Sequence, residues 1–176
     1  MQVPVIETDR LILRGYRLGD FSDYAAMWAD PAVTRHIADG SPRSEEESWK
    51  SFLSMSGHWE LLGFGTWAVE ERATGRFVGS AGFAERMRDR GPALEGVPEL
   101  GYGFVSSVSG RGFATEAAKA AVAWARTHFG NTRLIAIVAP DNLASIHVAE
   151  KCGFREVSRG LSGGRHRVFF EAILAE

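Results

Sequence analysis

Two glycines flank an arginine in "SGRGFATEA", where a predicted strand gives way to a predicted helix. Glycines at such a turn let the backbone approach an anion closely, and the unpaired N–H groups of the first helical turn attract negative charge. Gly110, Gly112 and the amides of Phe113 to Thr115 are therefore candidates for binding a phosphate. The alternative is an ordinary strand-to-helix turn, whose geometry also favours glycine.

Two common phosphate-binding motifs fit this turn poorly. The P-loop pattern is absent, because no glycine is followed at the required spacing by Gly-Lys-Ser/Thr. The dinucleotide fingerprint GxGxxG shares its first two glycines with "GRGFAT", but Thr115 occupies the third position. That fingerprint also belongs to the first unit of a doubly wound sheet, whereas three strands predicted to be antiparallel come before this turn. A dinucleotide-binding oxidoreductase stays open as an alternative.

Composition narrows the class of protein. The chain has 176 residues, a formal net charge of -2 and one cysteine, Cys152. This length predicts one domain over residues 1–176, and the charge argues against nucleic acid as a partner. The five histidines lack metal-ligand spacing, so we expect no metal. The N-terminus resembles no signal peptide and no apolar run could span a membrane, which predicts a cytoplasmic protein.

The elements that must position the turn follow from periodicity and capping signals. A strand in "DRLILRGYR" is followed by a helical pattern in "LGDFSDYAAMWADP", where Asp20 is the expected N-cap and Pro31 marks the stop. Ser44 to Glu47 form a capping box that predicts a helix reaching about Leu62. The first half of the chain therefore reads strand, helix, helix.

The second half begins with three strands predicted to be consecutive and antiparallel, in "TWAVEE", "FVGSAGFAE" and "VPELGYGFV". A helix over Ala114 to Phe129, a strand in "RLIAIVA" and a helix over about Leu143 to Lys151 come next. Two terminal strands, in "FREVSR" and "HRVFFEAIL", complete the chain. The predicted order is β-α-α-β-β-β-α-β-α-β-β, and the loops at 30–44, 85–97 and 159–166 are where we expect an acceptor site.

Several motifs in this order carry a family resemblance. "SGRGFATEA", followed about 30 residues later by "DNLASIHVAEKCGF", resembles the GNAT superfamily of N-acetyltransferases, and so do "ETDRLILRGYRLGDFSDYAAMWADPAV" and "PELGYGFV". The resemblance is to the RimJ/RimL-like branch, which acetylates ribosomal-protein N-termini. It implies one α+β domain with a mixed, mostly antiparallel, splayed sheet flanked by helices. Acetyl-CoA would be the co-substrate.

The resemblance also implies where the co-substrate binds. The family's loop [QR]-x-x-G-x-[GA] falls on Ser109 to Ala114 and departs at its first position. The strand around Phe104 and Val105 would hydrogen-bond the pantetheine arm, and Asn142 would contact it, although asparagine also favours the N-cap of the helix that follows. The residues expected around the pyrophosphate are Arg111, Gly112, Phe113, Ala114 and Thr115.

Acetylating an amine requires a base, since an amine near neutral pH is at least partly protonated, and a proton for the departing thiolate. By resemblance, Glu99 is the candidate base, with a solvent-facing strand carboxylate as the alternative. The tyrosine that many relatives use as the acid is Ala149 here, so the resemblance points to Ser145, unless that serine is only a helix-surface residue. Cys152 is better explained as a small buried side chain than as a nucleophile.

The function predicted from this resemblance is transfer of acetyl from acetyl-CoA to a primary amine by direct attack in a ternary complex. The acceptor is a protein N-terminus or a small-molecule amine, and a homodimer is allowed. A non-catalytic acyl-CoA-binding regulatory module stays open as a different class of answer, because Ala149 has replaced the usual acid. Arginines at 86, 88, 90, 165 and 167 predict a basic rim at the acceptor side, which favours acidic acceptors.

Overall fold

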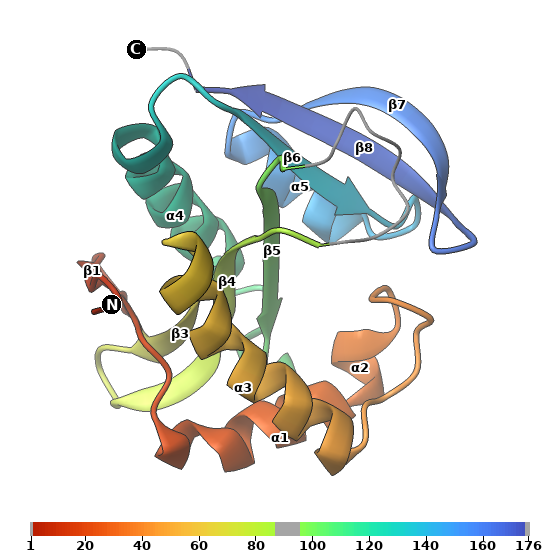
Figure 1. Cartoon of the computed structure of the whole chain (residues 1–176). Coiled ribbons are helices and arrows are strands. Elements are labelled where there is room, and N and C mark those ends of the chain that lie inside the picture. Colours follow the sequence, from red (N-terminus) through yellow and green to blue (C-terminus); the bar gives the residue numbers. More distant parts are fainter. Residues whose placement is uncertain (1, 87–95, 175–176) are drawn as a thin grey trace.

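A single eight-stranded sheet with helices on both faces organises the part of the chain that the computed structural model describes, residues 2–86 and 96–174 (Figure 1). The strand order is β1-β2-β3-β4-β5-β6-β8-β7. In chain order the elements are β1 Ile6–Glu7, β2 Leu11–Arg14, α1 Phe21–Ala29, α2 Pro31–Thr34, α3 Glu45–Leu62, β3 Thr66–Glu71, β4 Arg76–Ala84, β5 Glu99–Phe104, α4 Phe113–Phe129, β6 Arg133–Val138, α5 Leu143–Lys151, β7 Arg155–Ser162 and β8 Arg165–Ile173.

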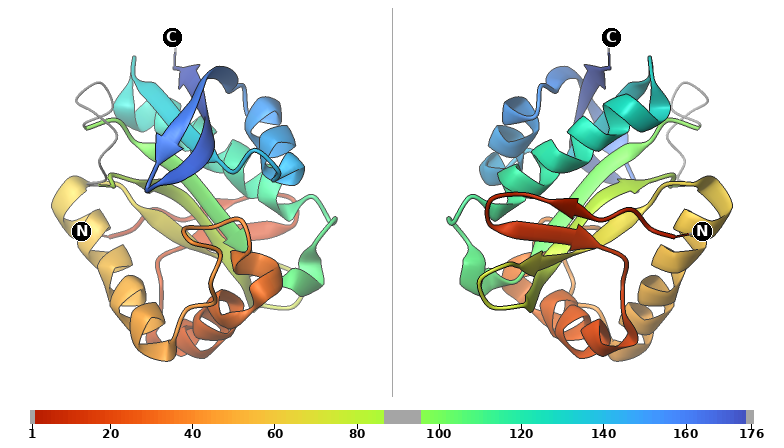
Figure 2. Two further views of the ribbon diagram at one scale, coloured as in Figure 1. Left: turned by 90° about the vertical axis from the view of Figure 1, so that its right-hand side faces the viewer. Right: turned by 90° about the vertical axis from the view of Figure 1, so that its left-hand side faces the viewer.

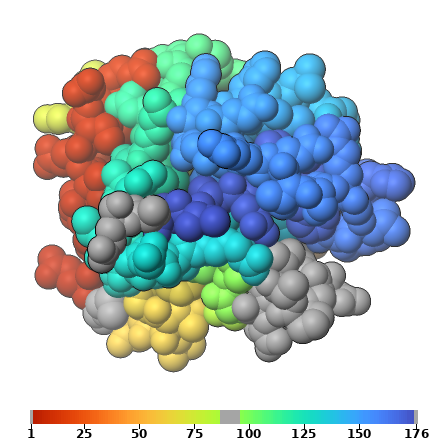
Figure 3. All heavy atoms as spheres, turned by 90° about the horizontal axis from the view of Figure 1, so that it is seen from above, coloured from red at the N-terminus to blue at the C-terminus, as the bar shows by residue number. Residues whose placement is uncertain are grey.

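The sheet is mixed and mostly antiparallel, as predicted. Strands β3, β4 and β5 are consecutive and antiparallel, and the terminal pair β7 and β8 is antiparallel as well. The parallel contact is the one between β5 and β6. Figure 3 shows the N-terminal residues and the C-terminal strands on opposite sides of the molecule, which agrees with β1 and β7 forming the two edges of the sheet.

Local signals explain most element boundaries. The capping box at the start of α3 is present: the Ser44 hydroxyl accepts from the Glu47 N–H at 3.2 Å, and the Glu47 carboxylate accepts from the Ser44 N–H at 2.8 Å. Helix α5 has the predicted bounds, and α4 begins at Phe113, one residue before the predicted Ala114. Two short elements were not predicted, β1 and α2, because two to four residues are too few for a periodicity.

Asp20 is the N-cap residue of α1, as predicted, but its side chain has a different role. The carboxylate caps none of that helix's amides. It accepts instead from the Arg17 N–H at 2.7 Å and from two nitrogens of the buried Arg14 guanidinium, each at 2.8 Å. Arg14 also pairs with Glu70 of β3 at 2.7 Å. The carboxylate therefore joins β2 to the start of α1, and through Arg14 to β3.

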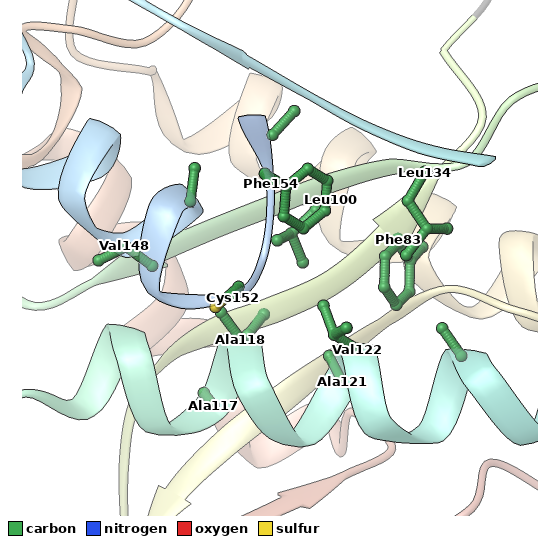
Figure 4. Close-up of a cluster of buried hydrophobic side chains, with 14 of the residues drawn as sticks. Phe83, Leu100, Ala117, Ala118, Ala121, Val122, Leu134, Val148, Cys152 and Phe154 are labelled. Atoms are coloured by element: carbon green, nitrogen blue, oxygen red, sulfur yellow. The ribbon is translucent and has the colours of Figure 1, made fainter. Parts of the chain in front are cut away.

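Two apolar cores flank the sheet. The larger lies beneath α4 and α5, where the alanine face of α4 meets strand residues such as Phe83 and Leu100 (Figure 4). Ala118 and Ala121 are fully buried there, because small side chains let the helix lie close to the sheet. The smaller core lies beneath α1 and α3 and centres on Tyr24 and Phe52. The site described next lies where the sheet between these cores opens.

Candidate active site

Strands β5 and β6 touch at one end and then diverge (Figure 1). In the described residues they pair at one position, Glu99 with Ile135, where the Ile135 N–H donates to the Pro98 carbonyl at 3.1 Å. Beyond it, β5 stays paired with β4 as far as Phe104, and β6 stays paired with β8 as far as Val138. The sheet is therefore splayed, as predicted.

The splay leaves one edge of β5 open to a ligand. The Val105 N–H donates to the Val78 carbonyl at 3.0 Å, so it points toward β4. Backbone groups alternate in direction along a strand, which turns those of Tyr102 and Phe104 toward the gap. A linear ligand with amide groups can pair with this edge as a further strand would. Of the two predicted strand residues, Phe104 offers its backbone to the gap and Val105 does not.

A cavity of about 450 Å³ occupies the splay. Its wall includes β5 from Glu99 to Gly103 and β6 from Ala136 to Val138, and it reaches side chains on both faces of the sheet. Three predicted site residues line it together: Glu99, Asn142 and Ser145. The remaining predicted residues, Phe104, Val105 and Arg111 to Thr115, do not line it.

Glu99 lies at the narrow end of the splay, where β5 and β6 meet. Its residue surface is 5% exposed, and its Oε1 lies 3.5 Å from Arg86 Nε. The next residues on the same face of β5 are Gly101 and Gly103, which have no side chains. A Cβ at Gly103 would lie 2.9 Å from the Trp28 ring, whereas at Gly101 it would meet only Arg86, at 3.7 Å. The floor beside the carboxylate is therefore bare at Gly101 and covered by Trp28 at Gly103.

Ser145 lies in the first turn of α5, on the other side of the cavity. The Asn142 side-chain oxygen accepts from the Ser145 N–H at 3.2 Å, which confirms that Asn142 caps this helix. The Tyr102 hydroxyl donates to the Ser145 carbonyl at 3.1 Å. Burial raises the pKa of Tyr102 to about 12, so its hydroxyl keeps its proton near neutral pH. Ala149 is fully buried in the core.

Sequence reasoning missed Tyr102, although it lies three residues from the candidate base. It also took Tyr24 and Trp28 as the apolar face of a helix, yet both line the cavity. The Tyr24 hydroxyl shares a hydrogen bond of 2.9 Å with the Ser51 hydroxyl, and the Tyr16 hydroxyl donates to Ser80 Oγ at 2.6 Å. The sequence did contain a signal for a polar site: these aromatic residues carry a hydroxyl or an N–H on an otherwise apolar face.

The glycine turn lies beyond the far end of β5, apart from the cavity. Gly110 and Gly112 have φ of 77° and 78°, in the left-handed region that glycine adopts at no steric cost. Gly112 is the N-cap of α4 and offers no side chain to the helix, so none satisfies the first amides there. The Phe113 side chain is buried, which leaves its backbone for a ligand. This is the arrangement that binds anions at helix N-termini.

The side chains of Arg10 and Arg111 hold this turn in place through contacts with distant segments. Arg10 donates to the Arg111 carbonyl at 2.8 Å, and its Nε donates to the Glu116 carboxylate at 2.7 Å. The Arg111 guanidinium forms an ion pair with Glu71 and lies 4.3 Å from the centre of the Phe113 ring. The predicted phosphate ligand Arg111 thus has its charge partnered by a carboxylate, so the backbone amides are the stronger candidates in this turn.

The predicted basic rim is divided between two roles. Arg86 and Arg167 line the cavity, whereas Arg165 does not. Arg165 and Arg167 both donate to the Ala38 carbonyl, at 3.0 and 2.9 Å, and tie the β7–β8 hairpin to the loop after α2 (Figure 2, left). Ala38 itself has a φ of 47°, which is unusual for a residue with a side chain. The predicted rim residues 88 and 90 lie outside the described residues.

Cys152 is buried, and its environment is not that of a nucleophile. Burial raises the pKa of the Cys152 thiol to about 11, which disfavours the thiolate a nucleophile would need. Trp124 of α4 packs edge-on against Trp59 and Trp67. Across residues 2–86 and 96–174, no three His, Cys, Asp or Glu side chains are grouped to hold a metal ion. No helix in that part of the chain is long and apolar enough to cross a membrane.

Comparison with known proteins adds to this geometry. A family model described as an acetyltransferase (GNAT) domain matches residues 10–155. This chain belongs to the GNAT family. The uncharacterized N-acetyltransferase YoaA of Bacillus subtilis is 28% identical over 153 residues, covering 87% of this GNAT chain and 84% of that protein. A GnaT-family acetyltransferase structure from Bordetella pertussis has a TM-score of 0.84 at 30% identity, covering 96% of this chain and 98% of its own.

The GNAT fold extends to more distant structures. RimL, a ribosomal L7/L12 α-N-protein acetyltransferase in complex with coenzyme A, has a TM-score of 0.76 and covers 97% of this chain and 98% of its own. At 16% identity this likeness shows the shared fold alone. The predicted GNAT membership is confirmed, and the chain is an N-acetyltransferase. The dinucleotide-binding alternative required a doubly wound sheet, and the mostly antiparallel sheet contradicts it.

Proposed function

We propose that this acetyl-CoA-dependent GNAT enzyme acetylates a primary amine by direct attack, with Glu99 as base and Ser145 as proton donor. One observation carries the proposal: a single cavity passes through the splayed sheet and is lined by Glu99 on one side and Ser145 on the other. A thioester and an amine entering from opposite faces would meet there without a covalent enzyme intermediate. The buried, high-pKa Cys152 supports the absence of such an intermediate.

The donor half of the site is proposed from backbone geometry. The uncapped amides of Phe113 to Thr115 would bind the pyrophosphate of acetyl-CoA, helped by the dipole of α4. The pantetheine arm carries amides, and the open edge of β5 at Tyr102 and Phe104 would pair with them. Asn142 lines the same cavity and would contact the pantetheine arm. This arrangement would hold the thioester against β5.

The chemistry then needs two proton movements. The amine nitrogen attacks the thioester carbonyl carbon, a C–N bond forms, and Glu99 takes the proton that the nitrogen loses. The C–S bond breaks as the tetrahedral intermediate collapses, and the thiolate takes a proton from the Ser145 hydroxyl. The serine then regains a proton from water, and Glu99 releases its proton to water. An N–H on the open edge of β5 would stabilise the developing oxyanion. Each role falls on a group that borders the splay.

The acceptor is proposed to be either the α-amine of a protein N-terminus or a small-molecule amine. The cavity reaches the space between α1, α3 and the loop after α2, which lies on the face opposite α4. RimL, as its name states, acetylates a ribosomal-protein N-terminus, which keeps protein acceptors among the candidates. The bare floor at Gly101 admits an unbranched amine.

The first prediction concerns the base. Glu99→Gln should lower kcat by about 100-fold, in the range typical of general base catalysis, and remove the acidic limb of the pH profile. Binding of acetyl-CoA should stay within about twofold of wild type, because the proposed pyrophosphate site lies beyond the other end of β5. Thiol release measured against pH with a panel of amines checks this, together with calorimetry for CoA.

Two results would contradict the proposal. An unchanged pH profile in Glu99→Gln would remove Glu99 as the base. CoA binding without acetylation of any amine in a broad panel, with products examined by mass spectrometry, would favour the non-catalytic acyl-CoA-binding module. Glu85→Gln is the matched control, since Glu85 is a carboxylate just after β4 that does not line the cavity.

A further inference from the structure

Two buried donors in the cavity wall have no hydrogen-bond partner in the described part of the chain. The indole Nε1 of Trp28 and the hydroxyl of Ser162 are both in this state, although these residues are 8% and 5% exposed. A buried donor left without an acceptor is costly, so such groups are rare in native proteins. Both residues line the cavity. Together they show that donors outnumber acceptors in this part of the cavity wall.

Two arginine side chains that line the same cavity form no ion pair with a carboxylate of the described residues. Arg43 lies with its guanidinium carbon 4.1 Å from the centre of the Trp28 ring and donates to Ser51 Oγ at 3.2 Å. Arg167 donates to the carbonyls of Ala38 and His166. Among the described residues, neither has an Asp or Glu oxygen within the 4.0 Å of an ion pair. A guanidinium has five N–H donors, so both arginines keep donors to offer.

The charge on Arg167 is poorly compensated. Burial, and next the neighbouring Arg165, hold the pKa of Arg167 below its ordinary value, and the attraction of Asp141 offsets them only in part. A guanidinium in this condition attracts an anion, because the anion would relieve both burial and repulsion. Arg43 differs in that it is stacked on an aromatic ring, which fixes the plane of its fork. The two arginines come from different elements, the loop before α3 and strand β8.

The carboxylates that line the cavity are already engaged elsewhere. Glu99 faces Arg86, and the Asp39 carboxylate accepts from the Ser41 N–H at 3.0 Å. His36 Nδ1 lies 3.4 Å from Asp141 Oδ1. The cavity wall therefore carries three arginines and two carboxylates, and within residues 2–86 and 96–174 no Asp or Glu oxygen forms an ion pair with Arg43 or Arg167.

The phosphates of acetyl-CoA are not the missing anion in the proposed binding mode. The amides of Phe113 to Thr115 lie outside this cavity, beyond the far end of β5. Arg43 is attached to the α1 side of the molecule, where its N–H donates to the Trp28 carbonyl at 2.9 Å. The unpartnered donors thus belong to the acceptor half of the site.

We infer that the acceptor amine carries a carboxylate, which Arg43 and Arg167 bind while the amine lies beside Glu99. This inference rests on the proposed function and specifies its substrate class. Arginine pairs with carboxylates through two parallel hydrogen bonds. Two sources offer this chemistry: a free amino acid, and a peptide with an acidic side chain close to its N-terminus.

The test compares acceptors that differ only in charge. One arm uses ω-amino acids of increasing chain length, and compares each with the corresponding carboxamide. The other uses amidated tripeptides with aspartate or asparagine in the second position. With acetyl-CoA saturating, at least one carboxylate should exceed its neutral partner in kcat/KM by about tenfold or more, as expected for charge-assisted hydrogen bonds. The arm in which it appears identifies the source.

Variants assign the effect to the arginines. Arg167→Gln should remove most of the preference for the carboxylate, measured as the ratio of kcat/KM between each carboxylate and its carboxamide. Arg165→Gln is the matched control, because Arg165 makes the same bond to Ala38 but does not line the cavity. Arg43→Gln should act like Arg167→Gln. Its control is Arg159→Gln, which removes an exposed arginine that pairs with Glu156 on β7.

The outcomes separate this inference from the proposed function. Equal kcat/KM for every carboxylate and its carboxamide would overturn the inference and leave the proposed function in place. Loss of preference in Arg165→Gln equal to that in Arg167→Gln would overturn it too, since the bond to Ala38 would then be the cause. If no amine is acetylated although CoA binds, the proposed function fails first. Thermal unfolding of each variant verifies that it is folded.

Discussion

At the scale of single residues, Ser145 depends on a neighbour that sequence reasoning overlooked. The Tyr102 hydroxyl donates to the Ser145 carbonyl, and the Asn142 side chain accepts from the Ser145 N–H, so both backbone groups of this serine are held. The proposed donor is therefore oriented from two directions. Tyr102 acts through Ser145 and is a positioning residue.

The second prediction separates these two hydroxyls. Ser145→Ala should lower kcat by about 10- to 100-fold, since it removes the proposed acid. Tyr102→Phe should lower kcat by only a few-fold, because it removes one hydrogen bond worth about 1 kcal/mol. With a pKa of about 12, Tyr102 stays protonated up to about pH 11, so Tyr102→Phe should leave the shape of the pH profile unchanged. Loss of an alkaline limb in Tyr102→Phe would make Tyr102 the acid instead.

At the scale of elements, the N-terminus of α4 combines a left-handed glycine turn with side-chain contacts that hold it in place. Gly112 has a left-handed backbone, and Arg10 connects the turn to the first strands through Arg111 and Glu116. The Glu116 carboxylate also accepts from the Thr8 hydroxyl at 2.6 Å. The amides that we propose for the pyrophosphate are thus preorganised by contacts more than 100 residues apart in sequence.

The third prediction uses the two ends of this helix. Gly112→Ala should weaken CoA binding by about tenfold, because a left-handed alanine costs about 1 to 2 kcal/mol and the turn would relax from its binding geometry. Gly130→Ala is the matched control: it adds a side chain at a positive φ of 63° at the opposite end of α4. It should lower stability without changing the Kd for CoA. Calorimetric titration distinguishes the two, and equal affinities would contradict the assignment.

At the scale of the whole molecule, buried charges hold the N-terminal segment onto the sheet. Arg14 joins Asp20 ahead of α1 to Glu70 on β3, and both Arg14 and Asp20 are buried. Burial by itself raises the pKa of Asp20, but hydrogen bonds from Arg14 and from the Arg17 N–H outweigh it and the net pKa lies below its ordinary value. The smaller core beneath α1 and α3, which walls the acceptor side, depends on this connection.

The fourth prediction follows from this depressed pKa. Stability due to Asp20 should be fully present above its unfolded pKa of about 3.9 and be lost as the pH falls through the lower folded value. Asp20→Asn should cost about 3 kcal/mol at pH 7, since it leaves a buried arginine partly uncompensated. Urea unfolding at several pH values checks this. A difference from wild type that did not shrink as the pH falls below the unfolded pKa would contradict the electrostatic origin.

Sequence by itself determined the features that depend on neighbouring residues. The capping box at Ser44, the glycine turn before α4 and the strand and helix periods all arise from contacts within a few positions, so they could be predicted. Glu99, Ser145 and Asn142 were selected by resemblance to a family, and nothing local showed that they share a cavity.

Only the tertiary structure decided which distant groups meet. Glu99 and Ser145 line one cavity because β5 and β6 pair at a single position, and the pairing of Arg10 with Glu116 and of Arg111 with Glu71 follows from strand order. The unpartnered donors of Trp28 and Ser162 come from α1 and β7, over 100 residues apart. Such contacts depend on chain closure and packing, which no local period encodes.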